Sequence, residues 1–65
     1  MPELENYFAA LIDEMSATNY ENVYNRLCGA YSVAVIIKHG EDVKRFFDVG
    51  KEKYNILKRR QNKNA

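Results

Sequence analysis

The sequence predicts a small all-α domain of three helices, with a long central helix that pairs with a second copy of the chain. Apolar residues recur at helical spacing in three stretches, polar breaks separate these stretches, and the middle stretch is apolar nearly all round. The 65 residues form one domain at most. A chain this short buries only about 60% of its unfolded surface, so its core is marginal and oligomerisation is favoured.

The first stretch, from Pro2 to Met15, has the pattern of an amphipathic helix. Proline suits a first helical turn, where its missing N–H is not needed, and the acidic residues Glu3 and Glu5 suit the positive end of the helix dipole. The apolar residues that follow recur at intervals of three and four: Leu4, Tyr7, Phe8, Leu11, Ile12 and Met15. They form one stripe, which we expect to face the core.

The second helix is predicted to follow a polar break at residues 16–19 and to run to about Lys38. Thr18 and Glu21 match a capping box, in which each side chain bonds a free backbone N–H at the start of the helix. One apolar stripe comprises Tyr20, Val23, Tyr24, Leu27, Tyr31, Ala34 and Val35. A second stripe lies roughly opposite, in the later half of the helix only, and comprises Ala30, Val33, Ile36 and Ile37. Gly29 and Ser32 flank it and allow another backbone to come close.

A strand from Tyr31 to Ile37 is the alternative to this part of the helix, because several of its residues are β-branched. A single strand would have nothing to pair with except the same strand of a second chain. The helix is therefore the preferred interpretation, and both interpretations require a partner.

The third helix is predicted to begin at Glu41 and Asp42, after a turn in which Gly40 takes a left-handed conformation. Its apolar stripe comprises Val43, Phe46, Phe47, Tyr54 and Leu57. Gly50 interrupts this stripe and indicates a close helix crossing or a kink. Residues 1–57 form the predicted domain, and Lys58 to Ala65 form a basic tail that we expect to be frayed.

The second stripe of the central helix is the strongest candidate site. Burying one such side chain is worth about 1.5–3 kcal/mol, so leaving three exposed costs a marginal domain several kcal/mol. The stripe is either a wall of the core, covered by the ends of the other helices, or a protein interface, and we favour the interface. The predicted interface residues are Gly29, Ala30, Ser32, Val33, Ile36, Ile37, Val49 and Ile56.

Charge is unevenly distributed along a chain whose net charge is only +1. Acidic residues gather near the N-terminus, and the basic residues near the C-terminus are Lys51, Lys53, Lys58, Arg59, Arg60 and Lys63. The preferred interpretation is that an acidic first helix packs beside a basic last helix; the alternative is contact with nucleic-acid phosphates. The sequence does not suggest a recognition helix with base-reading side chains on one face. The tyrosines of the central helix either rim the core or stack on bases, and we favour the core.

No constellation for catalysis or metal binding is evident. Cys28 and His39 are the only residues of their types, which excludes an intrachain disulfide and a closed Cys/His zinc site. No cofactor is expected. The longest apolar run, about eleven residues, is shorter than the ~20 of a membrane span, and the acidic start does not resemble a signal peptide. We expect a cytoplasmic, non-enzymatic regulatory or inhibitory module that acts as a helical oligomer on a larger protein; the alternative is a nucleic-acid-binding regulator.

Overall fold

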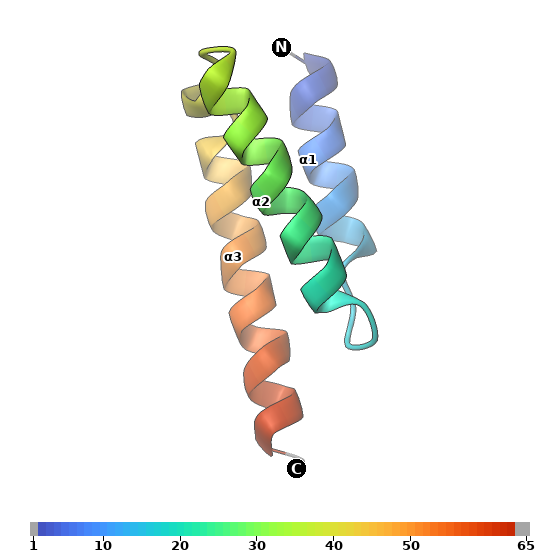
Figure 1. Ribbon diagram of the computed structural model, residues 1–65. Coiled ribbons are helices and arrows are strands. Elements are labelled where there is room, and N and C mark those ends of the chain that lie inside the picture. The colour runs from blue at the N-terminus through green and yellow to red at the C-terminus, as the bar shows by residue number, and fades with distance from the viewer. Residues whose placement is uncertain (1, 64–65) are drawn as a thin grey trace.

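Three helices make up the computed structural model, which describes residues 2–63: α1 (Pro2–Glu14), α2 (Tyr20–Ile36) and α3 (Gly40–Lys63). Each helix runs opposite to the preceding one, so α1 and α3 point the same way (Figure 1). The described residues contain no strand, which confirms the all-α prediction and makes the strand alternative wrong. Met1, Asn64, Ala65 and the side chain of Lys63 lie outside the described part of the chain.

The central helix was expected to be the long one, but the longest helix is α3, with 24 residues against 17 in α2. The difference arises at the C-terminus, where α3 continues past Leu57 to Lys63. Residues 58–63 were expected to be a frayed tail and are helical instead. The last turns of α3 extend beyond the turn between α1 and α2 (Figure 1).

The core lies along the line where the three helices meet. Its buried side chains are Phe8, Leu11, Met15, Val23, Leu27, Ala34 and Val43. All seven belong to the predicted apolar stripes. Two other members of those stripes, Tyr7 and Val35, are 47% and 52% exposed, because they lie at the edges of the helix faces that pack together.

The predicted capping box at the start of α2 is wrong. Asn19 is the N-cap residue, and no side chain bonds the first free N–H groups of α2. The Asn19 side chain instead closes the end of α1: its Nδ2 donates to the carbonyl of Glu14 at 2.9 Å, and its Oδ1 accepts from the N–H of Ser16 at 2.6 Å. The Thr18 hydroxyl lies within hydrogen-bonding distance of the Ser16 hydroxyl, at 3.1 Å. It therefore bonds within the turn and does not cap α2.

The left-handed residue between α2 and α3 is Lys38, with φ of 67°, and not Gly40 as predicted. The N–H groups of Lys38 and His39 donate to the carbonyls of Val35 (3.0 Å) and Ala34 (2.7 Å), the pattern of a Schellman motif. Gly40 is instead the first residue of α3 and is buried. A Cβ at Gly40 would lie 2.8 Å from Val35 Cγ2, so glycine is needed there for a close approach.

Replacing Lys38 with glycine is expected to stabilise the fold by about 0.5–1 kcal/mol. Glycine avoids the steric cost of about 1–2 kcal/mol that a side chain has in the left-handed region, and part of this gain is lost to the greater freedom of glycine in the unfolded chain. Urea unfolding followed by circular dichroism measures the change. Lys44→Gly, at an exposed position inside α3, is the control and should destabilise by about 1 kcal/mol. A loss of stability in both variants would contradict the left-handed assignment.

Gly50 marks the point where α3 crosses both other helices, which confirms the predicted close crossing. A Cβ at this position would collide with Leu27 Cδ2 of α2 and lie 3.3 Å from Ile12 Cγ1 of α1. Nearby, Lys53 Nζ donates to the Ile12 carbonyl in the last turn of α1 at 2.6 Å. A cation suits the negative end of a helix dipole, so this contact holds α3 against α1.

Candidate interaction surfaces

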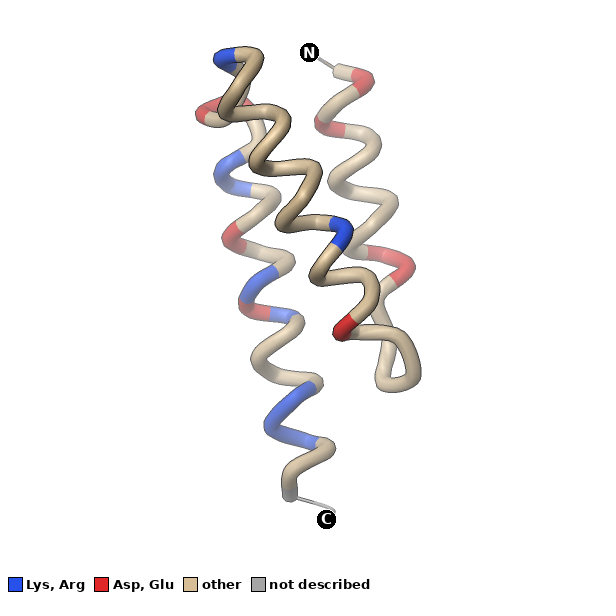
Figure 2. The backbone as a smooth tube through the Cα atoms, in the orientation of Figure 1, with Lys and Arg blue, Asp and Glu red and all other residues tan. Residues whose placement is uncertain are grey.

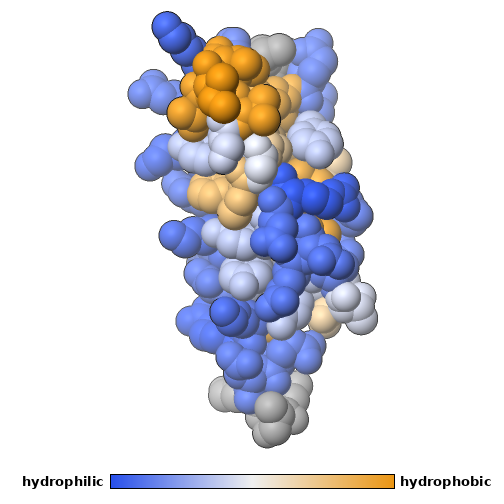
Figure 3. Space-filling model, in the orientation of Figure 1, coloured by the Kyte–Doolittle hydropathy of each residue, from blue (hydrophilic) through white to orange (hydrophobic). Residues whose placement is uncertain are grey.

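An apolar surface lies at the C-terminal end of α2 and consists of Val33, Ile36 and Ile37, which we call the apolar tip. Their exposed fractions are 56%, 77% and 46%, so neither α1 nor α3 covers them. Apolar side chains gather over this end of the molecule (Figure 3). The alternative that this stripe is a wall of the core is therefore wrong for the described chain.

Two small residues continue the outward face of α2 below the apolar tip. Gly29 is exposed, and a Cβ there would have no atom within 4 Å. Ser32 is exposed as well, and its hydroxyl donates to the carbonyl of Cys28 at 3.1 Å, so it bonds within its own helix. Ala30 is partly buried against the core. The open space at Gly29 leaves room for another backbone to approach α2 closely.

The other two predicted interface residues lie on a different face of the molecule. Val49 lines a groove between α1 and α3, together with Ala9, Ile12 and Phe46. Ile56 is half-buried and lies among the polar residues Arg59, Arg60 and Asn62 of the same helix. The structure therefore does not join either residue to the apolar tip, because both project from α3 whereas the tip is the outward face of α2.

Of the predicted phosphate-binding residues, Lys51, Lys58, Arg59 and Arg60 are exposed on α3. Lys53 is not free to bind a ligand, since it is bonded to α1, and the side chain of Lys63 lies outside the described residues. The first and last helices pack side by side as expected, but the last basic turns of α3 extend beyond α1 (Figure 2).

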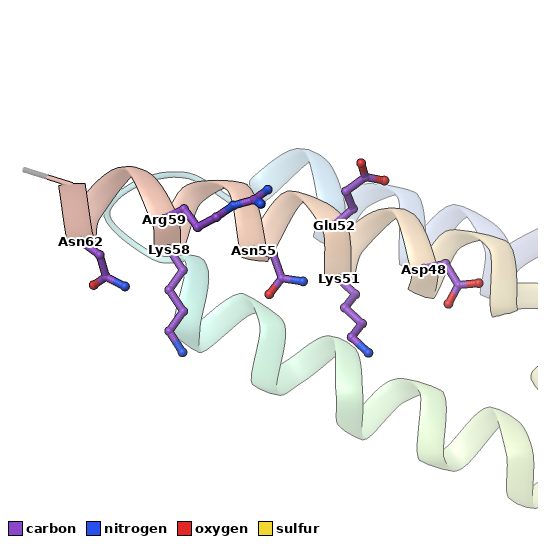
Figure 4. Close-up of a pocket in the computed structure, with 7 residues that line it drawn as sticks. All are labelled: Asp48, Lys51, Glu52, Asn55, Lys58, Arg59 and Asn62. Carbon is purple, nitrogen blue, oxygen red and sulfur yellow. The ribbon is translucent and has the colours of Figure 1, made fainter.

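The exposed basic residues share their helix face with asparagines that sequence reasoning missed. A shallow depression on α3 is lined by Asp48, Lys51, Glu52, Asn55, Lys58, Arg59 and Asn62. Lys51, Asn55, Lys58 and Asn62 project toward the same side in the close-up (Figure 4). The spacing of seven between Asn55 and Asn62 was the available signal, but it has meaning only on a helix, and residues from 58 onward were expected to be frayed.

The aromatic residues form a ladder between α2 and α3. Tyr24 stacks on Tyr54 with ring centroids 4.2 Å apart, and Tyr31 stacks on Phe47 at 4.4 Å. Tyr20 lies against Tyr54 at 5.7 Å, and Tyr24 and Phe47 are 6.3 Å apart. Because the rings stack on one another, these tyrosines pack as part of the core, as preferred from the sequence. The stacked ring faces are not available to bind nucleic-acid bases.

Among the described side chains, two titratable groups have shifted pKa values, and both shifts have local causes. Burial raises the pKa of Tyr24, and the neighbouring half-buried Cys28 acts in the same direction. The hydrogen bond from His39 Nδ1 to Asp42, 2.8 Å long, holds the pKa of the Asp42 carboxyl below its ordinary value. Both pairs are local: Tyr24 and Cys28 lie one turn apart in α2, and His39 and Asp42 span the start of α3.

Within residues 2–63, no three His, Cys, Asp or Glu side chains gather into a group that could hold a metal ion. None of the helices described is long and apolar enough to cross a bilayer. No protein-family model, curated protein or solved structure matches this chain.

Proposed function

We propose that this chain is a small non-enzymatic interaction module whose apolar tip docks on the tip of a second copy. The observation that supports the proposal is the exposure of Ile36, at 77%, beside two further apolar residues that are about half exposed. Burying side chains of this kind is worth about 1.5–3 kcal/mol each. A 65-residue domain has a small free energy of unfolding. A partner that binds the tip of the folded chain therefore also stabilises the fold.

A second copy is the proposed occupant because the tip is small and apolar on an otherwise polar surface, so another apolar tip is a matching cover (Figure 3). Two-fold pairing is the commonest symmetry of homo-oligomers, and Gly29 allows the two α2 helices to come close.

The role we propose for this dimer is regulatory or inhibitory. The dimer would leave the outer surfaces of α1 and α3 free to bind a larger protein, and polar side chains such as Asn19, His39 and Lys53 are engaged in turns and helix contacts. A cytoplasmic location fits the single thiol, Cys28, because a reducing compartment leaves it unpaired.

Replacing Val33 with aspartate is expected to abolish self-association, because the pairing of two tips would bury a charge from each copy without a partner. Sedimentation over a wide range of concentrations should give a dimer for the unmodified chain and a monomer for Val33→Asp. The matched control is Val49→Asp, which makes the same change at a residue of similar exposure, 52% against 56%, on the other side of the bundle.

The control should remain dimeric, and circular dichroism should show helical content close to that of the unmodified chain in both variants. A monomeric unmodified chain at every concentration would overturn the proposal. Equal loss of the dimer in both variants would place the interface elsewhere.

A further inference from the structure

We infer that the outward face of α3 binds duplex DNA by entering its major groove. This face consists of Asn55, Arg59 and Asn62 along its centre, with Lys51 and Lys58 on one flank. The inference rests on a different helix and on different residues from the proposed dimer, so either can fail without the other.

Helical spacing places these five residues on one side of α3. At 100° per residue, Asn55, Arg59 and Asn62 lie within one narrow strip, and Lys51 and Lys58 lie seven residues apart beside it. The side chains of Lys51, Asn55, Lys58 and Asn62 point the same way (Figure 4). All five residues are exposed, and none of their side chains bonds to another helix among the contacts described.

The end of α3 is accessible to a duplex because it stands apart from the other helices. Leu57 is its last residue packed against the core, and the turns that follow project beyond α1 and α2 (Figure 1). A lone helix is about 10–12 Å across with its side chains, and the major groove of B-form DNA is about 12 Å wide. The corresponding groove of an RNA duplex is too narrow for this, which selects DNA.

The side chains on this strip have the chemistry to read bases and hold phosphates. Asparagine bonds adenine through two hydrogen bonds, and arginine bonds guanine in the same way. Asn55 and Asn62 are separated by about 10.5 Å along the helix axis, which is close to three base-pair steps. Lys51 and Lys58, on one flank of the strip, can approach the phosphates of one strand.

The two carboxylates of the depression determine which part of α3 contacts the DNA. Asp48 and Glu52 lie toward the N-terminal end of the face, where they repel phosphates. The C-terminal end carries Lys58, Arg59 and Arg60, and the sequence from residue 53 to residue 65 contains no acidic residue. Contact with DNA is therefore centred on residues 55–62.

Fluorescence anisotropy of the full chain with a random-sequence DNA duplex tests the phosphate contacts. Two such contacts, by Lys51 and Lys58, should weaken binding about 12-fold when salt rises from about 50 to about 200 mM. Lys58→Ala should reduce the slope of log affinity against log salt by about 1. Lys44→Ala is the control, because it removes the same charge from an exposed position near the other end of α3 and should leave binding unchanged.

Selection of bound duplexes from a random pool tests the base contacts. The unmodified chain should enrich sites with two adenines about three base pairs apart. The double variant Asn55→Ala with Asn62→Ala should lose this enrichment and keep the salt slope; alanine favours the helix, so the variant should fold, which circular dichroism checks. Absence of binding at low salt, equal binding of single-stranded DNA, or equal weakening by Lys44→Ala would each overturn the inference.

Discussion

Replacing Phe8 with alanine is expected to cause a large loss of stability, about 3–5 kcal/mol, and to leave the fold marginal or unfolded. Phe8 is completely buried in the middle of α1, where its ring is part of the cluster that joins all three helices. Truncating a buried phenylalanine costs about 3–5 kcal/mol. A domain of 65 residues has a total stability of about 3–10 kcal/mol, so this single change removes a large part or all of it.

Thermal and urea unfolding followed by circular dichroism measure this loss. Tyr7→Ala is the matched control, since Tyr7 is the neighbouring aromatic residue on α1 and is 47% exposed. Its ring meets that of Phe8 edge-on, with centroids 6.5 Å apart, and its removal should cost about 1 kcal/mol. Equal destabilisation by the two variants would contradict the assignment of the core.

The second large effect is expected from the two mid-helix glycines, which should respond to alanine in opposite ways. The comparison is made in the Val33→Asp chain, which is expected to be monomeric, so that no second copy approaches Gly29. There, Gly29→Ala should stabilise the fold by about 1 kcal/mol, because alanine is the better helix former and the new methyl group meets nothing within 4 Å. Gly50→Ala gains the same propensity but overpacks the crossing against Leu27 and Ile12, at a cost of about 1–3 kcal/mol. The propensity terms cancel in the difference between the two variants, which isolates the steric cost.

Leu27 is fully buried, so it cannot turn away to accept the methyl group at position 50. Replacing Leu27 with alanine removes the atom that collides. In that background, Gly50→Ala should no longer destabilise, and a double-mutant cycle by urea unfolding measures this coupling. If Gly50→Ala stabilises as much as Gly29→Ala, the close crossing is wrong.

The helices and their buried faces were predictable because helical periodicity is a local property. The apolar stripes follow directly from the spacing of apolar residues in the sequence, and the structure buries them. Examples are Phe8 and Leu11 in α1, and Val23 and Leu27 in α2. The capping at both turns was not predictable in the same way. Thr18 matches a capping pattern, yet Asn19 turns back to α1, because the geometry of the turn decides which free carbonyl or N–H lies within reach.

The candidate surfaces were predictable in part. The pattern of α2 indicated that Val33, Ile36 and Ile37 lie opposite the core-facing stripe, and the structure leaves them exposed. The pattern did not show that Val49 faces the groove beside α1. Asn55 and Asn62 were missed because a polar, basic end of a chain has no apolar stripe to reveal that it is helical.

By itself, the sequence determined that the chain forms three helices, which stripe of each helix is apolar, and that α2 has more apolar surface than its neighbours can bury. Only the tertiary structure decided that Gly50 is the point of crossing, that Lys38 takes the left-handed conformation, and that Lys53 is held by α1 while its basic neighbours remain exposed. The reason is physical. Periodicity is set by residues three and four apart, whereas crossings, turns and cross-helix bonds depend on distances between residues far apart in the chain.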